Sequence, residues 1–131
     1  MMYLRAIALV AKFKQGGGTS YIDEAIDLDR EALKHCPPGH PKRPVALTWL
    51  AMHLSDRYGH LGARGDLEEA IVLDREALNL CPQGHADRAI SLNNLAVDLT
   101  ARYNQLGAIQ DLEEAIVLGR EAIDLFPAWT P

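Results

Sequence analysis

One stretch of sequence recurs along this chain at a fixed interval. Residues 66–73 read DLEEAIVL, and residues 111–118 read the same eight letters 45 residues later (111 − 66 = 45). A looser copy, IDEAIDL, occupies residues 22–28, one interval earlier. A period between about 20 and 50 residues is typical of stacked repeats, in which each unit buries its apolar face only against its neighbours. The chain is therefore expected to form a linear stack of similar units.

Length and period together predict the domain organisation. The 131 residues suit one domain, which buries roughly two thirds of the surface of its unfolded chain. The interval divides this single domain, residues 1–131, into three units at about 1–41, 42–86 and 87–131.

Charge and apolar runs argue against two classes of partner. The net charge is −5 and the basic residues are scattered, whereas binding to a phosphate backbone needs clustered Lys and Arg. No apolar run approaches the roughly 20 residues that cross a bilayer, and the short apolar run at residues 6–10 is interpreted as part of a helix, not as a signal peptide. We therefore expect no nucleic-acid partner, no membrane association and a cytoplasmic location.

Each unit contains two stretches with helical periodicity. In the second unit Leu47, Leu50 and Leu54 recur at three- and four-residue spacing, and the stretch after Asp66 repeats this pattern. No segment shows the strict alternation of a strand. Six helices, arranged in antiparallel pairs with short polar loops, are expected at about residues 2–15, 20–35, 42–58, 65–80, 87–103 and 110–125.

The start of each second helix carries polar residues in a regular pattern. Asp66 followed by Glu69 matches a capping box, in which each side chain accepts a hydrogen bond from a backbone N–H of the first turn. The other expected pairs are Asp111 with Glu114 in the third unit and Ser20 with Asp23 in the first. The adjacent carboxylates at 68–69 and 113–114 are explained by the positive end of the helix dipole, not by acid–base catalysis.

The cysteines allow two interpretations. Residues 36–40 (CPPGH) and 81–85 (CPQGH) contain two Cys and two His, nominally a zinc site. The alternative is a repeated loop, which is favoured because the third unit has Phe126 and Thr130 at the same positions. A disulfide is not expected, since stacked helices lie about 8–10 Å apart, farther than a disulfide allows. We expect two free thiols and no metal site.

The helices also carry a pattern of small and large residues. Residues 92–99 read LNNLAVDL and residues 47–54 read LTWLAMHL, so a Leu-Ala pair lies between flanking leucines. Ala70, Ala77 and Pro82 follow in the second helix, and the other two units have the same spacing. Small residues at these positions let two helices cross closely. This arrangement resembles the tetratricopeptide repeat.

The resemblance implies an all-α fold: an α-solenoid of three antiparallel helix-pair repeats, six helices in all, wound as a right-handed superhelix. The unit of 45 residues is longer than the 34 residues of the common repeat. Residues 93–96 (NNLA) are similar to the kinesin-light-chain type of repeat, and the whole unit resembles the long arrays of fungal signalling proteins.

Two departures from the family pattern concern packing. Seven of the extra residues fall between Ala51 and Ala70, so residues 58–62 (YGHLG) are expected at the tip of a long hairpin. The family usually has an aromatic residue at a second-helix position where this chain has Asp29, Asp74 and Gly119.

The resemblance implies a function as a scaffold for protein–protein interaction, which binds a peptide or a helix in its concave groove. In the family the first helix of each pair lines that groove. Trp49 and Met52 are expected to act as apolar anchors and Asn94 as a polar guide, unless Trp49 packs against an adjacent repeat. By position, the groove residues are Tyr3, Ile7, Thr48, Trp49, Met52, Ser55, Asp56, Asn93, Asn94, Val97 and Thr100.

Two functions are not expected. Family members that clamp a terminal carboxylate use Lys, Arg and Asn, but the matching positions here are Tyr3, Ile7, Trp49, Ile90 and Asn94, which provide no cation. No nucleophile motif, phosphate loop or dinucleotide fingerprint occurs, so neither an enzyme nor a cofactor is expected.

The alternative function is structural. Arg5 stands where the other units have Leu50 and Leu95, and no polar capping helix follows the third unit. Uncapped repeats expose an apolar face. The chain is therefore expected either to be part of a larger signalling protein or to form a homo-oligomer, as a spacer or self-association module that stacks end to end.

Overall fold

The computed structural model of the chain describes residues 2–84 and 86–125, without the side chains of residues 2, 3 and 86. This part of the chain contains six α-helices and no strand. The helices are α1 (Met2–Lys14), α2 (Ser20–Lys34), α3 (Arg43–Leu61), α4 (Arg64–Leu80), α5 (Ala86–Leu106) and α6 (Ile109–Asp124). The predicted all-α solenoid of three helix pairs is confirmed.

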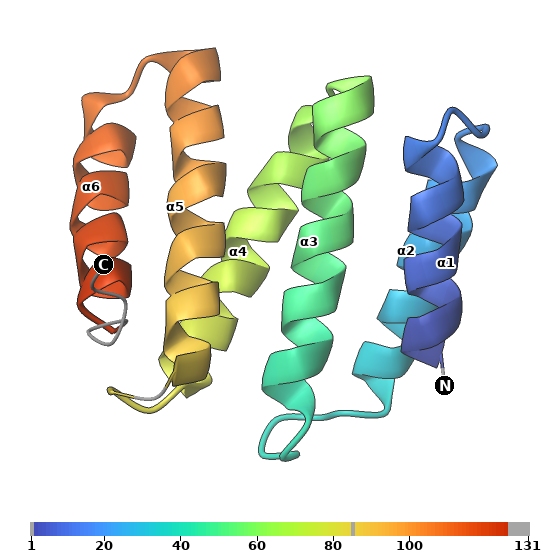
Figure 1. The fold of residues 1–131 in the computed structure, drawn as a ribbon, viewed down its shortest axis with the longest axis horizontal. Coiled ribbons are helices and arrows are strands. Elements are labelled where there is room, and N and C mark those ends of the chain that lie inside the picture. Colours follow the sequence, from blue (N-terminus) through green and yellow to red (C-terminus); the bar gives the residue numbers. More distant parts are fainter. Residues whose placement is uncertain (1, 85, 126–131) are drawn as a thin grey trace, which may run out of the picture.

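The three pairs follow one another across the molecule, from α1–α2 at one end to α5–α6 at the other (Figure 1). Each first helix packs chiefly on the second helix of its own pair. Successive pairs meet where α2 contacts α3 and where α4 contacts α5. The three leucines of α3 and the three of α5 lie at the centre of these contacts, and Leu50, Leu54 and Leu95 are at most 1% exposed.

Small residues lie where the paired helices cross. Ala25 and Ala70 are fully buried, and Ala115 is 7% exposed. These three residues occupy one position of the repeat, and a larger side chain there would push the helices apart.

The prediction of a long hairpin at residues 58–62 is wrong. α3 continues through Leu61 and ends at Gly62, whose φ of 72° is left-handed and whose N–H donates to the Tyr58 carbonyl over 2.7 Å. Gly107 ends α5 in the same way, with φ of 73°. The extra residues of the repeat lengthen its helices, because a left-handed glycine, and not Gly59, stops each first helix.

The predicted capping boxes are also wrong. α4 begins at Arg64, two residues before Asp66, and its N-cap makes no side-chain hydrogen bond. Asp66 instead accepts from Nε and Nη2 of Arg57, each over 2.8 Å, and Glu69 accepts from both terminal nitrogens of Arg30. Both acids have partners on other helices.

The same correction applies to the other two pairs. No side chain caps α2, and Asp23 accepts from Arg57 Nη1 over 2.9 Å. In α6, Asp111 and Glu114 bind Arg102 and Arg75. These hydrogen bonds hold the pKa of each of the two carboxyls below its usual value.

The ion pairs repeat with the period of the sequence. Arg57 joins Asp66 of its own pair to Asp23 of the preceding pair. Its equivalent, Arg102, likewise joins Asp111 to Glu68, over 2.9 and 2.8 Å. A second pair between units, Arg30 with Glu69, recurs as Arg75 with Glu114.

A third arginine position connects each first helix to the loop before it. Arg43 binds Glu76 within its pair and donates from Nη1 to the Cys36 carbonyl over 2.9 Å. Its equivalent, Arg88, binds Glu121 and donates to the Cys81 carbonyl over 3.2 Å. The repeated loops are therefore anchored through their backbone.

We expect the central leucines to determine stability. Replacing Leu50 by Ala should lower the free energy of unfolding by about 2–5 kcal/mol, because it leaves a cavity in a closely packed core. The measurement is chemical denaturation followed by circular dichroism. Val72→Ala serves as the control, since Val72 is 65% exposed and its truncation should cost less than about 0.5 kcal/mol. Equal losses in both variants would contradict this account of the core.

Candidate functional site

Three cavities lie between the first helices of successive pairs, one between α1 and α3 and two between α3 and α5. Met52 borders all three, because it projects from the middle of α3 between its neighbours. We refer to these three cavities together as the groove.

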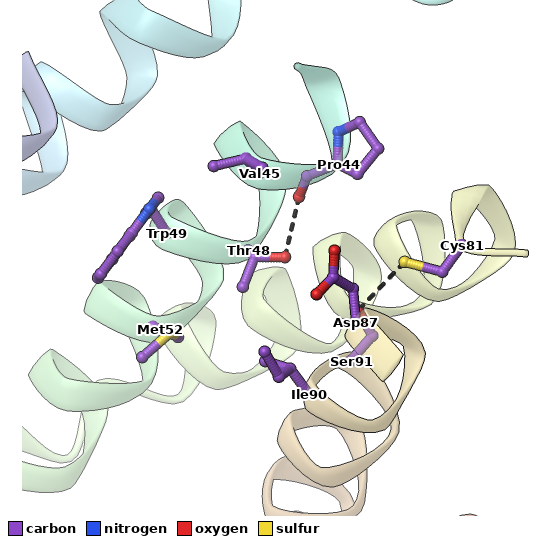
Figure 2. Close-up of a pocket in the computed structure, with 9 residues that line it drawn as sticks. All are labelled: Pro44, Val45, Thr48, Trp49, Met52, Cys81, Asp87, Ile90 and Ser91. Atoms are coloured by element: carbon purple, nitrogen blue, oxygen red, sulfur yellow. Dashed lines mark hydrogen bonds between the residues drawn. The ribbon is translucent and has the colours of Figure 1, made fainter. Parts of the chain in front are cut away.

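The larger cavity between α3 and α5 has a volume of about 400 Å³ and an apolar lining. Figure 2 shows Trp49 at one side of it and Cys81 and Asp87 at the other. Its apolar side chains are only partly covered: Val45 is 50% and Ile90 52% exposed. The lining residues are Pro44, Val45, Thr48, Trp49, Met52, Cys81, Asp87, Ile90 and Ser91.

The second cavity between these helices is smaller, about 160 Å³, and has buried acids at its base. Asp74 of α4 and Asp98 of α5 are 2% and 3% exposed. Burial, together with the neighbouring Asp98, raises the pKa of Asp74 to about 10. Asp74 is therefore protonated at neutral pH and can donate a hydrogen bond to Asp98, which also accepts from the Ser55 hydroxyl over 2.7 Å.

A different polar pair occupies the same place between the first two units. There the buried ring of His53 is hydrogen-bonded through Nδ1 to Asp29. Asp29 and Asp74 stand where the family usually has an aromatic residue, so buried polar pairs replace an aromatic contact at both interfaces. The Trp49 ring lies 5.7 Å from the His53 ring, and this contact holds it in place beside the groove.

The structure distributes the predicted groove residues over these cavities. Thr48, Trp49 and Met52 line the apolar cavity. Met52, Ser55, Asp56, Asn94 and Val97 line the polar one, and Ile7, Trp49, Met52 and Asp56 line the cavity between α1 and α3. Trp49 thus borders two cavities, although it is partly buried.

Two of the predicted residues lie elsewhere, and a third is not described. Asn93 lines a further cavity, between α5 and α6. Thr100 donates to the Ala96 carbonyl within α5 over 2.8 Å and borders none of the four cavities described. The side chain of Tyr3 lies outside the described residues.

Sequence reasoning missed several residues of the groove. Val45 and Ile90 form much of the apolar lining, and they are separated by one repeat interval, a signal that could have identified them. Asp98 takes the place of His53 in the next unit, but its proximity to Asp74 depends on how two pairs stack. Periodicity alone does not give that contact.

The Cys and His residues of the loops have other roles in the structure. Cys36 and Cys81 are free thiols, and His40 Nδ1 accepts from the backbone N–H of Lys42 over 3.0 Å. Within residues 2–84 and 86–125 no three His, Cys, Asp or Glu side chains form a metal-binding group. His85, Phe126 and Thr130, which entered the zinc argument, lie outside those ranges.

The family comparison matches the third helix pair. The family model of the tetratricopeptide repeat covers residues 88–124, most of α5 and all of α6. Residues 88–124 of this chain match the tetratricopeptide repeat. Comparison with curated proteins and with solved structures gives no match. Tetratricopeptide repeats are non-catalytic scaffolds that generally mediate protein–protein interaction.

None of the described helices is both long and apolar enough to span a bilayer.

We expect the Asp74–Asp98 pair to make stability depend on pH. The pKa of Asp74 is raised in the folded state, so the folded chain binds more protons than the unfolded chain between about pH 4 and about pH 10. Stability that is present at about pH 4 should therefore be lost as the pH rises. The side chain introduced by Asp74→Asn cannot ionise. At about pH 8 the free energy of unfolding of this variant, measured by denaturant titration, should exceed that of the wild type by roughly 1–3 kcal/mol.

The control for this experiment is Asp56→Asn. Asp56 lines the same cavity, but its carboxylate pairs with Lys14 over 3.2 Å and not with another acid. This variant should keep the dependence on pH that the wild type shows. If Asp74→Asn also follows the wild type at all pH values, the pair does not share a proton.

Proposed function

We propose that this chain is a protein-interaction module that binds a peptide or a helix in its groove. The apolar cavity between α3 and α5 is the observation that carries the proposal. Val45, Met52 and Ile90 are 50%, 38% and 52% exposed around it, and polar residues lie at its border. Exposed apolar patches with a polar rim are typical of interaction sites.

The side chains of the groove support a ligand of this kind. Trp is enriched among residues that dominate binding energies, and the contact with His53 limits the freedom that Trp49 would lose on binding. Asn94 Nδ2 has no hydrogen-bond partner among the described residues. This nitrogen is buried, so a carbonyl group of a peptide backbone would satisfy it only after the Asn94 side chain turns toward the groove.

The charges of the groove argue for an apolar ligand and against a terminal carboxylate. Lys14 is paired with Asp56, and Arg43 and Arg88 are directed to Glu76 and Glu121. An acidic C-terminal pentapeptide should therefore not bind at micromolar concentrations.

The proposal also includes the parent protein and the location in the cell. The resemblance to repeat arrays of signalling proteins supports a place in a larger signalling protein and in the cytoplasm. A second candidate function is end-to-end stacking of copies, which the exposed surface of α6 favours.

The test begins with peptides selected from a random library on the wild-type chain, followed by calorimetry. We expect Val45→Lys to weaken binding by about 10- to 100-fold, because it places a charge in the apolar cavity (a factor of 10 is about 1.4 kcal/mol). Val72→Lys is the matched control: Val72 is 65% exposed on α4, outside the four cavities, and this variant should bind within about twofold of the wild type.

An optical measurement locates the ligand independently. The chain has two Trp residues, so Trp129→Phe leaves Trp49 as the only indole. Its emission should shift in a saturable way when the peptide binds. Selected peptides that bind Val45→Lys as tightly as the wild type, and that leave the Trp49 emission unchanged, would place the function outside the groove.

A further inference from the structure

The outward surface of α6 exposes positions that the earlier units bury. Ile26 of α2 and Ile71 of α4 are 1% and 2% exposed, whereas their equivalent, Ile116, is 46% exposed. Ile123 is 73% exposed, although Leu33 and Leu78 at the same position pack partly against the cores. α2 and α4 are covered by the next helix pair, and no described element covers α6.

The same surface carries two charges whose equivalents are paired elsewhere. Glu113 stands at the position of Asp23 and Glu68, each of which binds an arginine of the following unit. Arg120 stands at the position of Arg30 and Arg75, each of which binds a glutamate of the following unit. Neither Glu113 nor Arg120 has an ion-pair partner among residues 2–84 and 86–125.

The opposite end of the molecule carries the complementary charges at the required positions. Lys12 of α1 is the equivalent of Arg57 and Arg102, and Glu24 of α2 is the equivalent of Glu69 and Glu114. Their present contacts are easily replaced. Lys12 lies 5.7 Å from the Tyr21 ring centre, and Glu24 pairs with Arg5 through side chains that are 46% and 68% exposed.

The two ends also agree at the position of the buried polar pairs. Both inner interfaces have a buried polar pair, Asp29 with His53 and Asp74 with Asp98. The third copies of these two positions are Gly119 on α6 and Ala8 on α1, so neither member of such a polar pair would lack its partner where the two ends meet. Arg5 stands at the position of the buried Leu50 and Leu95, and its long side chain must keep the guanidinium in water at the edge of the contact. Beside Gly119 lies a cavity of about 400 Å³, lined by Ala89, Ile90, Asn93, Asn94, Gly119, Ala122 and Ile123.

We propose that a second copy of this chain stacks on α6 through its own α1 and α2, in the register of the repeat. Lys12 of one copy then binds Glu113 of the other, Glu24 binds Arg120, and Ile116 becomes covered. The charges match at both of these positions, which argues for a second copy as the occupant. The contact joins two different surfaces and does not close on itself, so copies add without limit. This assembly rests on the second candidate function, end-to-end stacking, and is independent of the groove and of its ligand.

The test is the mass of the chain in solution at low salt, measured by sedimentation between about 5 and about 500 µM. The weight-average mass should rise beyond that of two 14.4-kDa chains without reaching a plateau. Ile116→Lys should abolish the rise. Val117→Lys should retain it, because Val117 is 64% exposed and its equivalent Val72 remains 65% exposed within the stack. Circular dichroism confirms that both variants keep their helices.

Charge reversal tests the register. Lys12→Glu and Glu113→Lys should each weaken association by roughly fivefold to tenfold, because a like-charge contact replaces an ion pair. An equimolar mixture of the two variants, or the double variant, should associate within about twofold of the wild type.

Three results would overturn the proposal. A constant mass of one chain means that another element, such as a further helix pair, covers α6. A plateau at two chains that Lys12→Glu does not affect means a symmetric contact between two α6 helices. Charge reversals that do not rescue each other mean a different register.

Discussion

The arginine at the end of each inner first helix sets the geometry on which the stack depends. Arg57 connects three helices: it lies on α3 and binds Asp66 of α4 and Asp23 of α2. The planar guanidinium can satisfy both carboxylates only in a narrow range of orientations. The crossing within a pair and the contact between pairs are therefore coupled through one side chain. The hydrogen bonds that Arg57 donates, above all to Asp66, raise the pKa of Arg57, so its guanidinium stays charged.

These contacts contribute more to register than to stability. The Arg57 side chain is 23% exposed, and ion pairs that water reaches are worth little in free energy. The free energy of folding comes mainly from the buried leucines and isoleucines of the two cores. Apolar packing alone would tolerate small rotations between units, and the directional hydrogen bonds exclude them.

Much of the fold could be predicted because repetition is a local property of the sequence. The six helices begin and end close to their expected residues, and the interval predicted which positions are equivalent. The wrong capping boxes have one physical origin. Asp66 and Glu69 have the spacing of a capping box, but Arg57 and Arg30 offer stronger, charged donors from other helices. A motif within one helix cannot report a partner that stacking brings near.

Less of the groove could be predicted, because its lining also depends on how the helix pairs stack. The resemblance selected Trp49, Met52 and Asn94, which do border the cavities, because a first helix presents the same side in each unit. The extent of the apolar lining depends instead on the space between α3 and α5. The raised pKa of Asp74 could not be inferred at all, since it requires two acids from different units to be buried together.

The positions of the glycines that end α3 and α5 determine the length of the groove. Because the extra residues of the unit are helical, α3 has 19 residues and α5 has 21. At 1.5 Å per residue, the two walls of the groove are about 28 and 31 Å long. A segment of about five helical turns can lie parallel to these walls along its whole length. Lengthening the helices rather than the loops thus enlarges the rigid surface and adds no mobile chain beside it.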